Sequence, residues 1–270
     1  MSGPKSAASS YLLQAVAPSP EGTRTWSVLF DLGPGSYGQM WHYVDPAQID
    51  AVVLSHLHAD HCGDMISLQV FQKWAPQSTG KRLPIYGPVG LEHRMKQLGG
   101  DMDEDFTSEF GYHEIPDEGG AFQIGPFNLM AFPAWHTVTT FGLRVEGPAG
   151  FPEGWHDAVQ LAQPEGETSI FAYTGDTDYC KPIVQMAKGA DLLLAEAGFL
   201  QKDMDLADRE CRGVHMTAER TGQLAAQAGA RALVATHIQP WSARGDVWDE
   251  VRRNWEGPLA LASAGTTYII

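Results

Sequence analysis

Ten residues of the chain, SHLHADHCGD at positions 55–64, hold a high density of groups that bind metal ions. Three histidines and an aspartate fall within six positions, at His56, His58, Asp60 and His61. Imidazole nitrogen and carboxylate oxygen are ligands that zinc and other borderline divalent metals accept, and a catalytic site keeps one position for water. The apolar run over residues 51–54 predicts a buried strand that ends where these residues begin. Residues 56, 58 and 60 would share one face if the segment stayed extended.

Three further residues of ligand type each follow an apolar run that resembles a strand. His136 follows NLMAFPAW, Asp176 follows SIFAYTG, and His237 follows RALVAT. Any one of them, taken alone, is also typical of a cap or a turn. Taken in order with the first cluster, they predict that distant strand ends complete a metal site.

The elements that must position these residues follow from periodicity. Runs rich in β-branched and apolar residues alternate with helical spacing. Strands are expected over residues 10–16, 25–32, 50–57, 82–87, 127–135, 141–147, 169–176, 191–198, 231–238 and 266–270. Helices are expected over residues 64–75, 89–98, 182–189, 217–230 and 246–255, with N-caps at Asp64, Thr217 and Asp246. Residues 99–121 and 147–168, rich in Gly, Pro and acids, are expected to be loops. The fold class is α/β or α+β, with layered sheets and helices in a single domain over residues 1–270.

The charge of the chain restricts its partners. A formal net charge of −15 repels nucleic-acid phosphates and anionic membrane surfaces unless basic residues cluster. The densest basic spots are only the pairs Lys81-Arg82 and Arg252-Arg253. Because a pair of bound cations would reverse the sign locally, small anionic substrates stay possible.

The cysteines and the apolar segments indicate the compartment. Cys62, Cys180 and Cys211 are widely spaced and form no CxxC, which argues against a disulfide framework and a thiolate zinc site. No apolar stretch reaches membrane-spanning length, and the first residues lack the features of a secretory signal. We therefore expect a cytoplasmic protein with no membrane partner.

The order of these motifs resembles the metallo-β-lactamase superfamily. That family has a strand-terminal Asp, then HxHxDH, then a His, an Asp and a His, each at a strand end; Asp31 in SVLFDLGPG matches the first. The resemblance covers nearly the whole chain. It implies an αββα sandwich of two mixed β-sheets flanked by helices, with the metals in a groove along one edge.

The resemblance also implies a ligand set for two metal ions. One ion would be held by His56, His58 and His136, the second by Asp60, His61 and His237, with Asp176 as the bridge and Asp31 orienting ligand histidines. Two ions about 3.5 to 4 Å apart share a hydroxide and polarise the oxygen of the electrophile, so the implied reaction is hydrolysis, with Asp60 among the catalytic residues. Such ligands suit zinc best, and manganese and iron are compatible. We expect Cys62 to be a small packed residue.

Two residues resemble the ribonuclease Z branch of this superfamily. Glu196 in LAEAGF and, later in the chain, His215 in GVHMTAER match a Glu and a His that form a dyad beside the metals. There the Glu orients the His, which serves the scissile phosphate or the leaving oxygen, a device suited to general-acid work near neutral pH. Ala195 stands where the branch often has His, which puts its orienting network in question.

The substrate is expected to be smaller than tRNA. Members that process tRNA carry a long basic arm between the later ligand motifs, whereas the stretch from His136 to Asp176 contains Arg144 as its single Lys or Arg. We therefore expect a phosphodiesterase for a cyclic nucleotide or a cyclic sugar phosphate. The alternative is a lactonase or other carboxylic-ester hydrolase, with Tyr179 as the phenol near the carbonyl. A tRNA 3′-processing endonuclease is less favoured, and nucleic acid is not an expected partner.

The start of the chain departs from the branch. Its members usually open with a strand before the segment that matches residues 8–13, and in MSGPKSAASSYLLQ no residues before that segment predict such a strand. We expect either a truncated start or an exposed sheet edge over residues 11–16. Such an edge would favour pairing, so a homodimer stays open.

Overall fold

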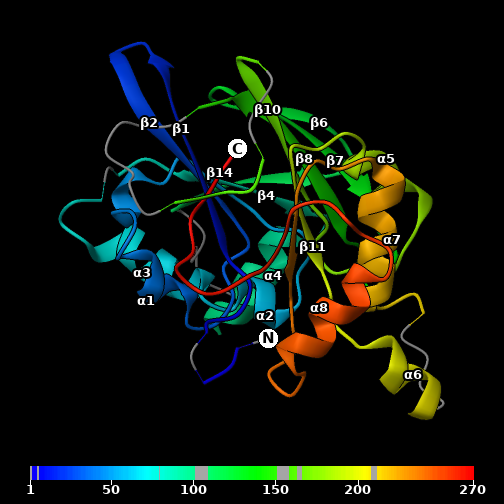
Figure 1. Ribbon diagram of the computed structural model, residues 1–270. Coiled ribbons are helices and arrows are strands. Elements are labelled where there is room, and N and C mark those ends of the chain that lie inside the picture. The colour runs from blue at the N-terminus through cyan, green and yellow to red at the C-terminus, as the bar shows by residue number, and fades with distance from the viewer. Residues whose placement is uncertain are drawn as a thin grey trace. The chain divides into compact units, whose positions relative to one another are not determined.

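The computed structural model describes residues 2–4, 6–78, 80–100, 109–150, 158–162, 166–207 and 212–270. The chain divides into two compact units, Met1–Asp117 and Glu118–Ile270. Each unit contains one main β-sheet with helices beside it (Figure 1).

The first unit is built on a five-stranded mixed sheet. Its strands, in sheet order, are β1 (Tyr11–Ser19), β2 (Gly22–Phe30), β3 (Ala51–Val53), β4 (Leu83–Pro88) and β5 (Phe110–Ile115). Strands β1 and β2 are antiparallel, and the other pairs are parallel. Because β2 and β3 run in the same direction, the residues after each strand emerge at the same edge of the sheet. That edge carries the predicted site residues of this unit.

Short helices flank this sheet. They are α1 (Ser36–Met40), α2 (Ala59–Cys62), α3 (Met65–Trp74) and α4 (Leu91–Gly99), with a 3₁₀ turn at Pro46–Gln48. Apolar side chains from the strands and helices form one core, in which Leu29, Val52, Leu54, Leu68 and Ile85 are almost completely buried. Leu54 follows β3 directly, so the segment that leads to His56 is fixed within this core.

The second unit contains a seven-stranded mixed sheet. Its strands, in sheet order, are β13 (Leu259–Leu261), β12 (Leu233–Thr236), β11 (Leu192–Glu196), β10 (Thr168–Tyr173), β8 (Phe141–Pro148), β7 (Phe127–Pro133) and β6 (Gly120–Ile124). Strands β10 to β13 are mutually parallel, whereas β6, β7, β8 and β10 pair antiparallel. A separate two-stranded sheet joins β9 (Val159–Gln160) to β14 (Tyr268–Ile269).

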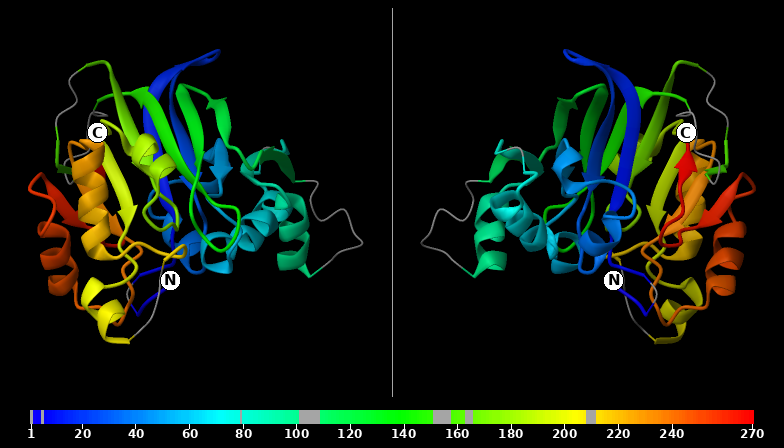
Figure 2. Two further views of the ribbon diagram at one scale, coloured as in Figure 1. Left: turned by 90° about the vertical axis from the view of Figure 1, so that its right-hand side faces the viewer. Right: turned by 90° about the vertical axis from the view of Figure 1, so that its left-hand side faces the viewer.

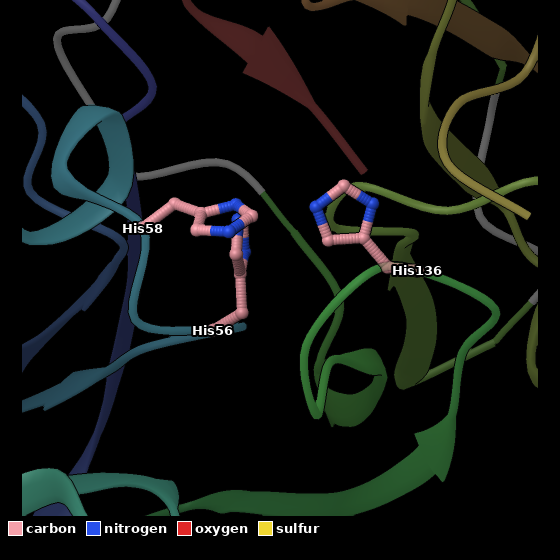
Figure 3. Close-up of side chains that lie close together, drawn as sticks. All are labelled: His56, His58 and His136. Carbon is pink, nitrogen blue, oxygen red and sulfur yellow. The ribbon is translucent and has the colours of Figure 1, made fainter. Parts of the chain in front are cut away.

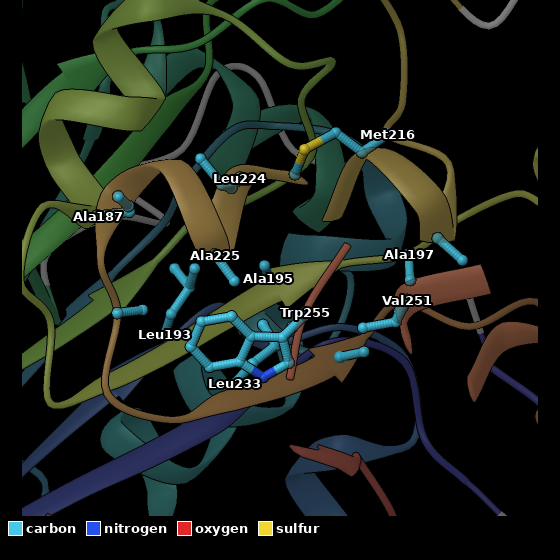
Figure 4. Close-up of a cluster of buried hydrophobic side chains, with 14 of the residues drawn as sticks. Ala187, Leu193, Ala195, Ala197, Met216, Leu224, Ala225, Leu233, Val251 and Trp255 are labelled. Atoms are coloured by element: carbon cyan, nitrogen blue, oxygen red, sulfur yellow. The ribbon is translucent and has the colours of Figure 1, made fainter. Parts of the chain in front are cut away.

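Helices pack on both halves of this sheet, with α5 on β7 and β8 and α7 on β11 and β12. The second unit contains α5 (Lys181–Ala187), α6 (Gln201–Ala207), α7 (Ala218–Ala228) and α8 (Arg244–Arg252), of which α7 lies beside both α5 and α8 (Figure 2). The buried face of α7 carries Ala218, Leu224 and Ala225, which join Leu193 and Trp255 in the core (Figure 4). A Cβ at Gly222 would lie 2.3 Å from the carbonyl oxygen of Val251, so the close approach of α7 to α8 requires glycine there.

Of the three predicted N-caps, Thr217 and Asp64 lie at N-cap positions and Asp246 does not. Thr217 occupies the N-cap of α7, and its side chain accepts a hydrogen bond from the backbone N–H of Arg220. Asp64 is at the N-cap position of α3, but its carboxylate accepts from the backbone N–H of Tyr37. The prediction for Asp246 is wrong, because α8 begins at Arg244 and Asp246 pairs with Lys202 from the first turn.

Every predicted strand and helix overlaps an observed element, but several elements were not expected. The loop prediction for residues 99–121 is wrong at its end, where Phe110–Ile115 forms β5 and Gly120 begins β6. Alternate residues Phe110 and Tyr112 pack on the apolar core of the first unit, and this burial overrides the Gly-rich and acidic composition. The other predicted loop, 147–168, contains β9, and its residues 151–157 and 163–165 lie outside the described part of the chain, as does Cys211. Helices α1, α2 and α6 and strand β13 were also not predicted.

Strand β1 lies at an edge of the five-stranded sheet formed by the described residues, as expected for residues 11–16. Among the described residues, no helix combines the length and the apolar character needed to span a bilayer.

Candidate functional site

The first unit carries four residues of ligand type, which we call the first ligand group: His56, His58, Asp60 and His61. They follow β3, where the chain is extended as far as His58 and then enters the short helix α2. Asp60 and His61 therefore lie on a helical turn, so the segment does not stay extended as far as Asp60. The ring centroids of His56 and His58 are 4.8 Å apart, and those of His56 and His61 are 4.2 Å apart. Figure 3 shows the side chains of His56 and His58.

Asp31, directly after β2, anchors this group. Its side chain is buried, and its backbone has φ +59°, a conformation that aspartate tolerates better than most residues. One carboxylate oxygen accepts from the backbone N–H of Ser55 at 2.7 Å. The other accepts from the Ser55 hydroxyl at 2.9 Å and from Nδ1 of His61 at 2.7 Å. Asp31 therefore forms hydrogen bonds with Ser55, directly before the first ligand group, and with His61, the last residue of that group.

These contacts fix which ring nitrogen carries hydrogen. A carboxylate can only accept, so Nδ1 of His61 is protonated and Nε2 holds the lone pair that a metal requires. The Ser55 hydroxyl donates its hydrogen to Asp31, so it accepts from Nδ1 of His56 at 3.0 Å. Asp31 thus orients His61 directly and His56 through Ser55. Ser55 was not predicted as a site residue, although it stands next to the first histidine.

Close backbone packing completes this region. The N–H of Leu32 donates to the carbonyl of His61 at 2.7 Å, and a Cβ at Gly33 would come within 2.0 Å of the carbonyl oxygen of Asp60. Cys62 is completely buried in the core of the first unit, as expected for a packed residue. Burial raises the pKa of its thiol to about 11, so the thiolate form that binds metals is disfavoured at neutral pH.

The second unit carries the second ligand group: His136, Asp176 and His237. Asp176 follows β10 and His237 follows β12, and these strands flank β11, which ends at Glu196. Because the three strands are parallel, their carboxyl ends meet at one edge of the sheet. Nδ1 of His237 lies 2.9 Å from a carboxylate oxygen of Asp176, and His237 has φ +54°.

Glu196 and His215 form a close pair at the same edge. One carboxylate oxygen of Glu196 lies 2.9 Å from Nδ1 of His215, and the other accepts from the backbone N–H of Thr177. Burial raises the pKa of Glu196 above its ordinary value, and the neighbouring His215 partly offsets this rise. Ligand atoms of Asp176, Glu196 and His215 all lie within 4.8 Å of one another. The predicted Glu–His pair is therefore present, next to a predicted ligand.

His136 lies on the loop after β7, where Figure 3 shows its side chain. Its Nδ1 donates to the backbone carbonyl of Val214 at 2.6 Å. A carbonyl cannot donate, so Nε2 again holds the lone pair. The ring centroid of His136 lies 5.1 Å from that of His215. Val214 could not be predicted from the sequence, because a backbone acceptor has no side-chain signature.

Tyr179 packs partly buried against the apolar core of the second unit. Burial raises the pKa of its phenol, and its backbone N–H donates to the carboxylate of Asp178. This environment is that of a packing residue.

The donor atoms of both groups are imidazole nitrogens and carboxylate oxygens, a set that fits zinc, manganese or iron. In His56, His61 and His136, the hydrogen-bond partner of Nδ1 selects Nε2 as the ligand atom. The clusters of histidine and carboxylate are thus able to bind metal ions.

Comparison with known proteins identifies the family. Residues 26–238 match the family described as Beta-lactamase superfamily domain. Protein Rv1339 of Mycobacterium tuberculosis is 32% identical over 270 residues, covering 98% of this chain and 87% of its own. The probable metallo-hydrolase YhfI of Bacillus subtilis is 29% identical over 244 residues, covering 89% and 86%. A ribonuclease Z of Bacillus velezensis is 28% identical over 242 residues, covering 78% and 77%.

Solved structures share the fold. The metallo-β-lactamase fold protein YhfI of Bacillus subtilis superposes with a TM-score of 0.74 at 24% identity, covering 97% of this chain and 92% of its own. A diphosphatase of the PhnP family gives 0.63 at 20% identity, with coverage of 89% and 78%. Yeast PDE1 gives 0.64 at 12% identity, with coverage of 97% and 95%.

The chain therefore belongs to the beta-lactamase superfamily. Its mixed sheets with flanking helices are consistent with the metallo-β-lactamase fold, which confirms the fold predicted from the sequence. Its family and its clusters of histidine and carboxylate make it a metal-dependent hydrolase.

Proposed function

We propose that this protein hydrolyses a small phosphodiester, such as a cyclic nucleotide or a cyclic sugar phosphate. The observation that carries the proposal is the contact between Glu196 and His215, 2.9 Å long and beside Asp176. Cleavage of a phosphodiester expels an alkoxide, which needs a proton, and a histidine held by a buried carboxylate is suited to provide it.

The proposed cofactor is a pair of divalent ions, with zinc as the first choice. We propose that His56, His58 and His136 hold one ion, that Asp60, His61 and His237 hold the other, and that Asp176 bridges them. Ions held in this way activate water for attack and stabilise negative charge on the oxygens of the substrate. The selection of Nε2 in His56, His61 and His136 supports this ligand set.

The protein's own groups divide the remaining work. Nδ1 of His215 carries a hydrogen that Glu196 accepts, so the proton for the leaving oxygen would leave from Nε2. Glu196 stabilises the imidazolium form before this transfer and holds the ring in place. The backbone N–H of Thr177 fixes the other oxygen of Glu196, which prevents the carboxylate from rotating away. Asp60 is the proposed catalytic carboxylate of the first unit.

Arg144 supports a small substrate over tRNA. It is the single Lys or Arg between His136 and Asp176, and its guanidinium donates to the backbone carbonyls of Met186 and Lys188. Burial lowers the pKa of Arg144, and the two carbonyls already engage the guanidinium that a phosphate would need. The similarity to ribonuclease Z therefore supports the chemistry of that branch and not its substrate.

The test is a substrate screen on protein loaded separately with zinc, manganese and iron. We expect turnover of bis(p-nitrophenyl) phosphate and of at least one cyclic nucleotide or cyclic sugar phosphate. Lactones, β-lactams and a precursor tRNA complete the screen. Turnover of lactones without diesterase activity would overturn the proposal in favour of a carboxylic-ester hydrolase. Efficient cleavage of the tRNA would overturn the choice of a small substrate.

A further inference from the structure

We propose that Asp178 is a positioning residue for the candidate site, acting on His136 through the segment at residues 212–214. This rests on the proposed function, because it assumes that His136 is a metal ligand. Nothing in the motif pattern distinguishes Asp178, which stands two residues after Asp176 in GDTDYC. Its surroundings distinguish it.

The carboxylate of Asp178 is completely buried and receives hydrogen bonds from several directions. One oxygen accepts from the backbone N–H of Tyr179 at 2.7 Å and from the guanidinium of Arg220 at 3.2 Å. The other accepts from the backbone N–H of Gly213 at 2.9 Å and forms an ion pair with Nε of Arg212 at 3.1 Å. A buried carboxylate is tolerated only with such partners, and here they tie residues 212–213 to the loop after β10.

The backbone of Asp178 ties down a third segment, the one that carries His136. Its N–H donates to the carbonyl of Trp135 at 2.8 Å, and the Trp135 N–H donates to the hydroxyl of Thr177 at 2.9 Å. Trp135 and Asp178 also form an isolated antiparallel β-bridge, which joins the two loops. The residue directly before His136 is therefore fixed to the residue whose side chain fixes Gly213.

The segment at 212–214 completes the connection. The carbonyl of Val214 accepts from Nδ1 of His136 at 2.6 Å. Gly213, with φ +74°, packs so close to Trp135 that a Cβ would lie 2.7 Å from the indole nitrogen. The guanidinium of Arg212 lies over the Trp135 ring, 5.1 Å from its centroid. His136 and the carbonyl that orients it are thus both anchored to Asp178.

It follows that Asp178 sets the direction in which Nε2 of His136 points. The Asp178 carboxylate contacts Gly213 and not His136, so its action passes through Gly213 and Val214. In Asp178→Asn, the amide has one acceptor oxygen in place of two, and its NH₂ group would face an N–H donor. The segment at 212–214 would then shift, and the carbonyl of Val214 with it.

The first measurement uses metal-free protein and no substrate. An imidazole N–H held by a carbonyl gives a protected, downfield proton signal in NMR, assigned to His136 by its loss in His136→Gln. We expect this signal to disappear or to exchange rapidly with water in Asp178→Asn. It should persist in Asp191→Asn, a matched control in which a carboxylate of the same unit that pairs with Arg231 and accepts from the N–H of Ile170 loses one of its two acceptor oxygens.

The second measurement is metal affinity, from competition with a chelator. We expect Asp178→Asn to bind zinc about tenfold more weakly, at the lower end of the range for residues that orient ligands. Asp191→Asn should bind as the wild type does. A lower unfolding temperature with an unchanged His136 signal and unchanged zinc affinity would overturn the proposal, because it would show a purely structural role.

A second variant covers the case in which Asp178→Asn does not fold. The Arg212 side chain is 45% exposed, so Arg212→Gln should fold while losing the ion pair with Asp178. We expect faster exchange of the His136 N–H and zinc binding weakened about threefold, with Arg231→Gln as its control. Equal behaviour of the two arginine variants would overturn the proposal. Because neither readout needs a substrate, failure of the diesterase screen would leave this result independent.

Discussion

The side chains of the first unit's site are oriented by one shared residue, whereas those of the second unit's site are oriented by separate partners. In the first unit, four residues within six positions share one anchor, Asp31, which binds His61 directly and His56 through Ser55. In the second unit, the three histidines lie in separate segments of the chain, and each has a different main partner. His136 donates to a backbone carbonyl, His237 pairs with Asp176, and His215 pairs with Glu196.

This difference shows where each half is vulnerable. A single carboxylate that orients two histidines concentrates the effect of a mutation, because losing it disturbs both rings at once. Independent partners confine the effect of a mutation to one ring. A mutation of Asp31 should therefore lower the metal affinity of the first group. In the second unit, a mutation that impairs proton transfer should leave metal binding intact.

Glu196→Gln should have the largest effect, and on turnover alone. The Gln side chain can still accept from the N–H of Thr177, which would turn its NH₂ group towards His215. His215 would then lose the carboxylate that stabilises its imidazolium form. We expect kcat for the diester to fall about 10²- to 10³-fold, within the range for general acid–base catalysis.

The zinc content of Glu196→Gln, measured by atomic emission, should stay that of the wild type. The matched control is Glu250→Gln, a buried carboxylate of the same unit that accepts from the N–H groups of Gln201 and Lys202. Loss of zinc in Glu196→Gln would show that the second unit does not separate the two tasks.

Much of the fold could be predicted because buried strands and helices have recognisable patterns of apolar residues in the sequence. Strands such as β11 and β12 are continuous apolar runs, which parallel strands covered by helices require. The failures have physical causes. Strand β5 reads FGYHEI, an edge strand in which the consecutive residues His113 and Glu114 are both exposed, so the sequence lacks the apolar–polar alternation of a half-buried strand. Helix α2 is a single turn, too short for a helical period.

The candidate site could be predicted only as far as side-chain chemistry marks it. The first group is contiguous, so HxHxDH identifies it, and Glu196 and His215 were found through a family resemblance. The orienting contacts of His136 were not predictable, because Val214 contributes a carbonyl that any residue has. Asp178 was missed because its role depends on arginines that are distant in sequence.

Asp31→Asn tests whether one carboxylate orients both His56 and His61 in the first group. Asparagine tolerates the positive φ of this position, so the change affects hydrogen bonding more than the backbone. With its oxygen on the N–H of Ser55, its NH₂ group would face Nδ1 of His61, and the ring would place its hydrogen on Nε2. We expect zinc affinity to fall about 100-fold, at the upper end of the range for orienting residues.

The control for Asp31→Asn is Asp50→Asn. Asp50 also accepts a backbone N–H, from Ser27, and pairs with Arg24, but it precedes β3 and so lies at the opposite end of that strand from His56. Chelator competition should show wild-type affinity for this variant. A similar loss in both variants would mean that general loosening of the first unit, and not ligand orientation, lowers the affinity.

Ser55→Ala should have the smallest effect. It tests whether Asp31 orients His56 through Ser55, that is, whether the two residues act in series. The change removes the acceptor of His56 but leaves Asp31 in contact with His61, so zinc affinity should fall about tenfold, with Ser27→Ala as the buried-serine control. In a series, the double variant Asp31→Asn/Ser55→Ala should lose little more than Asp31→Asn alone, because the serine has already lost the carboxylate that fixes its hydroxyl. Additive losses in this double-mutant cycle would contradict the series. They would mean that the two histidines of the first unit are oriented independently, as those of the second unit are.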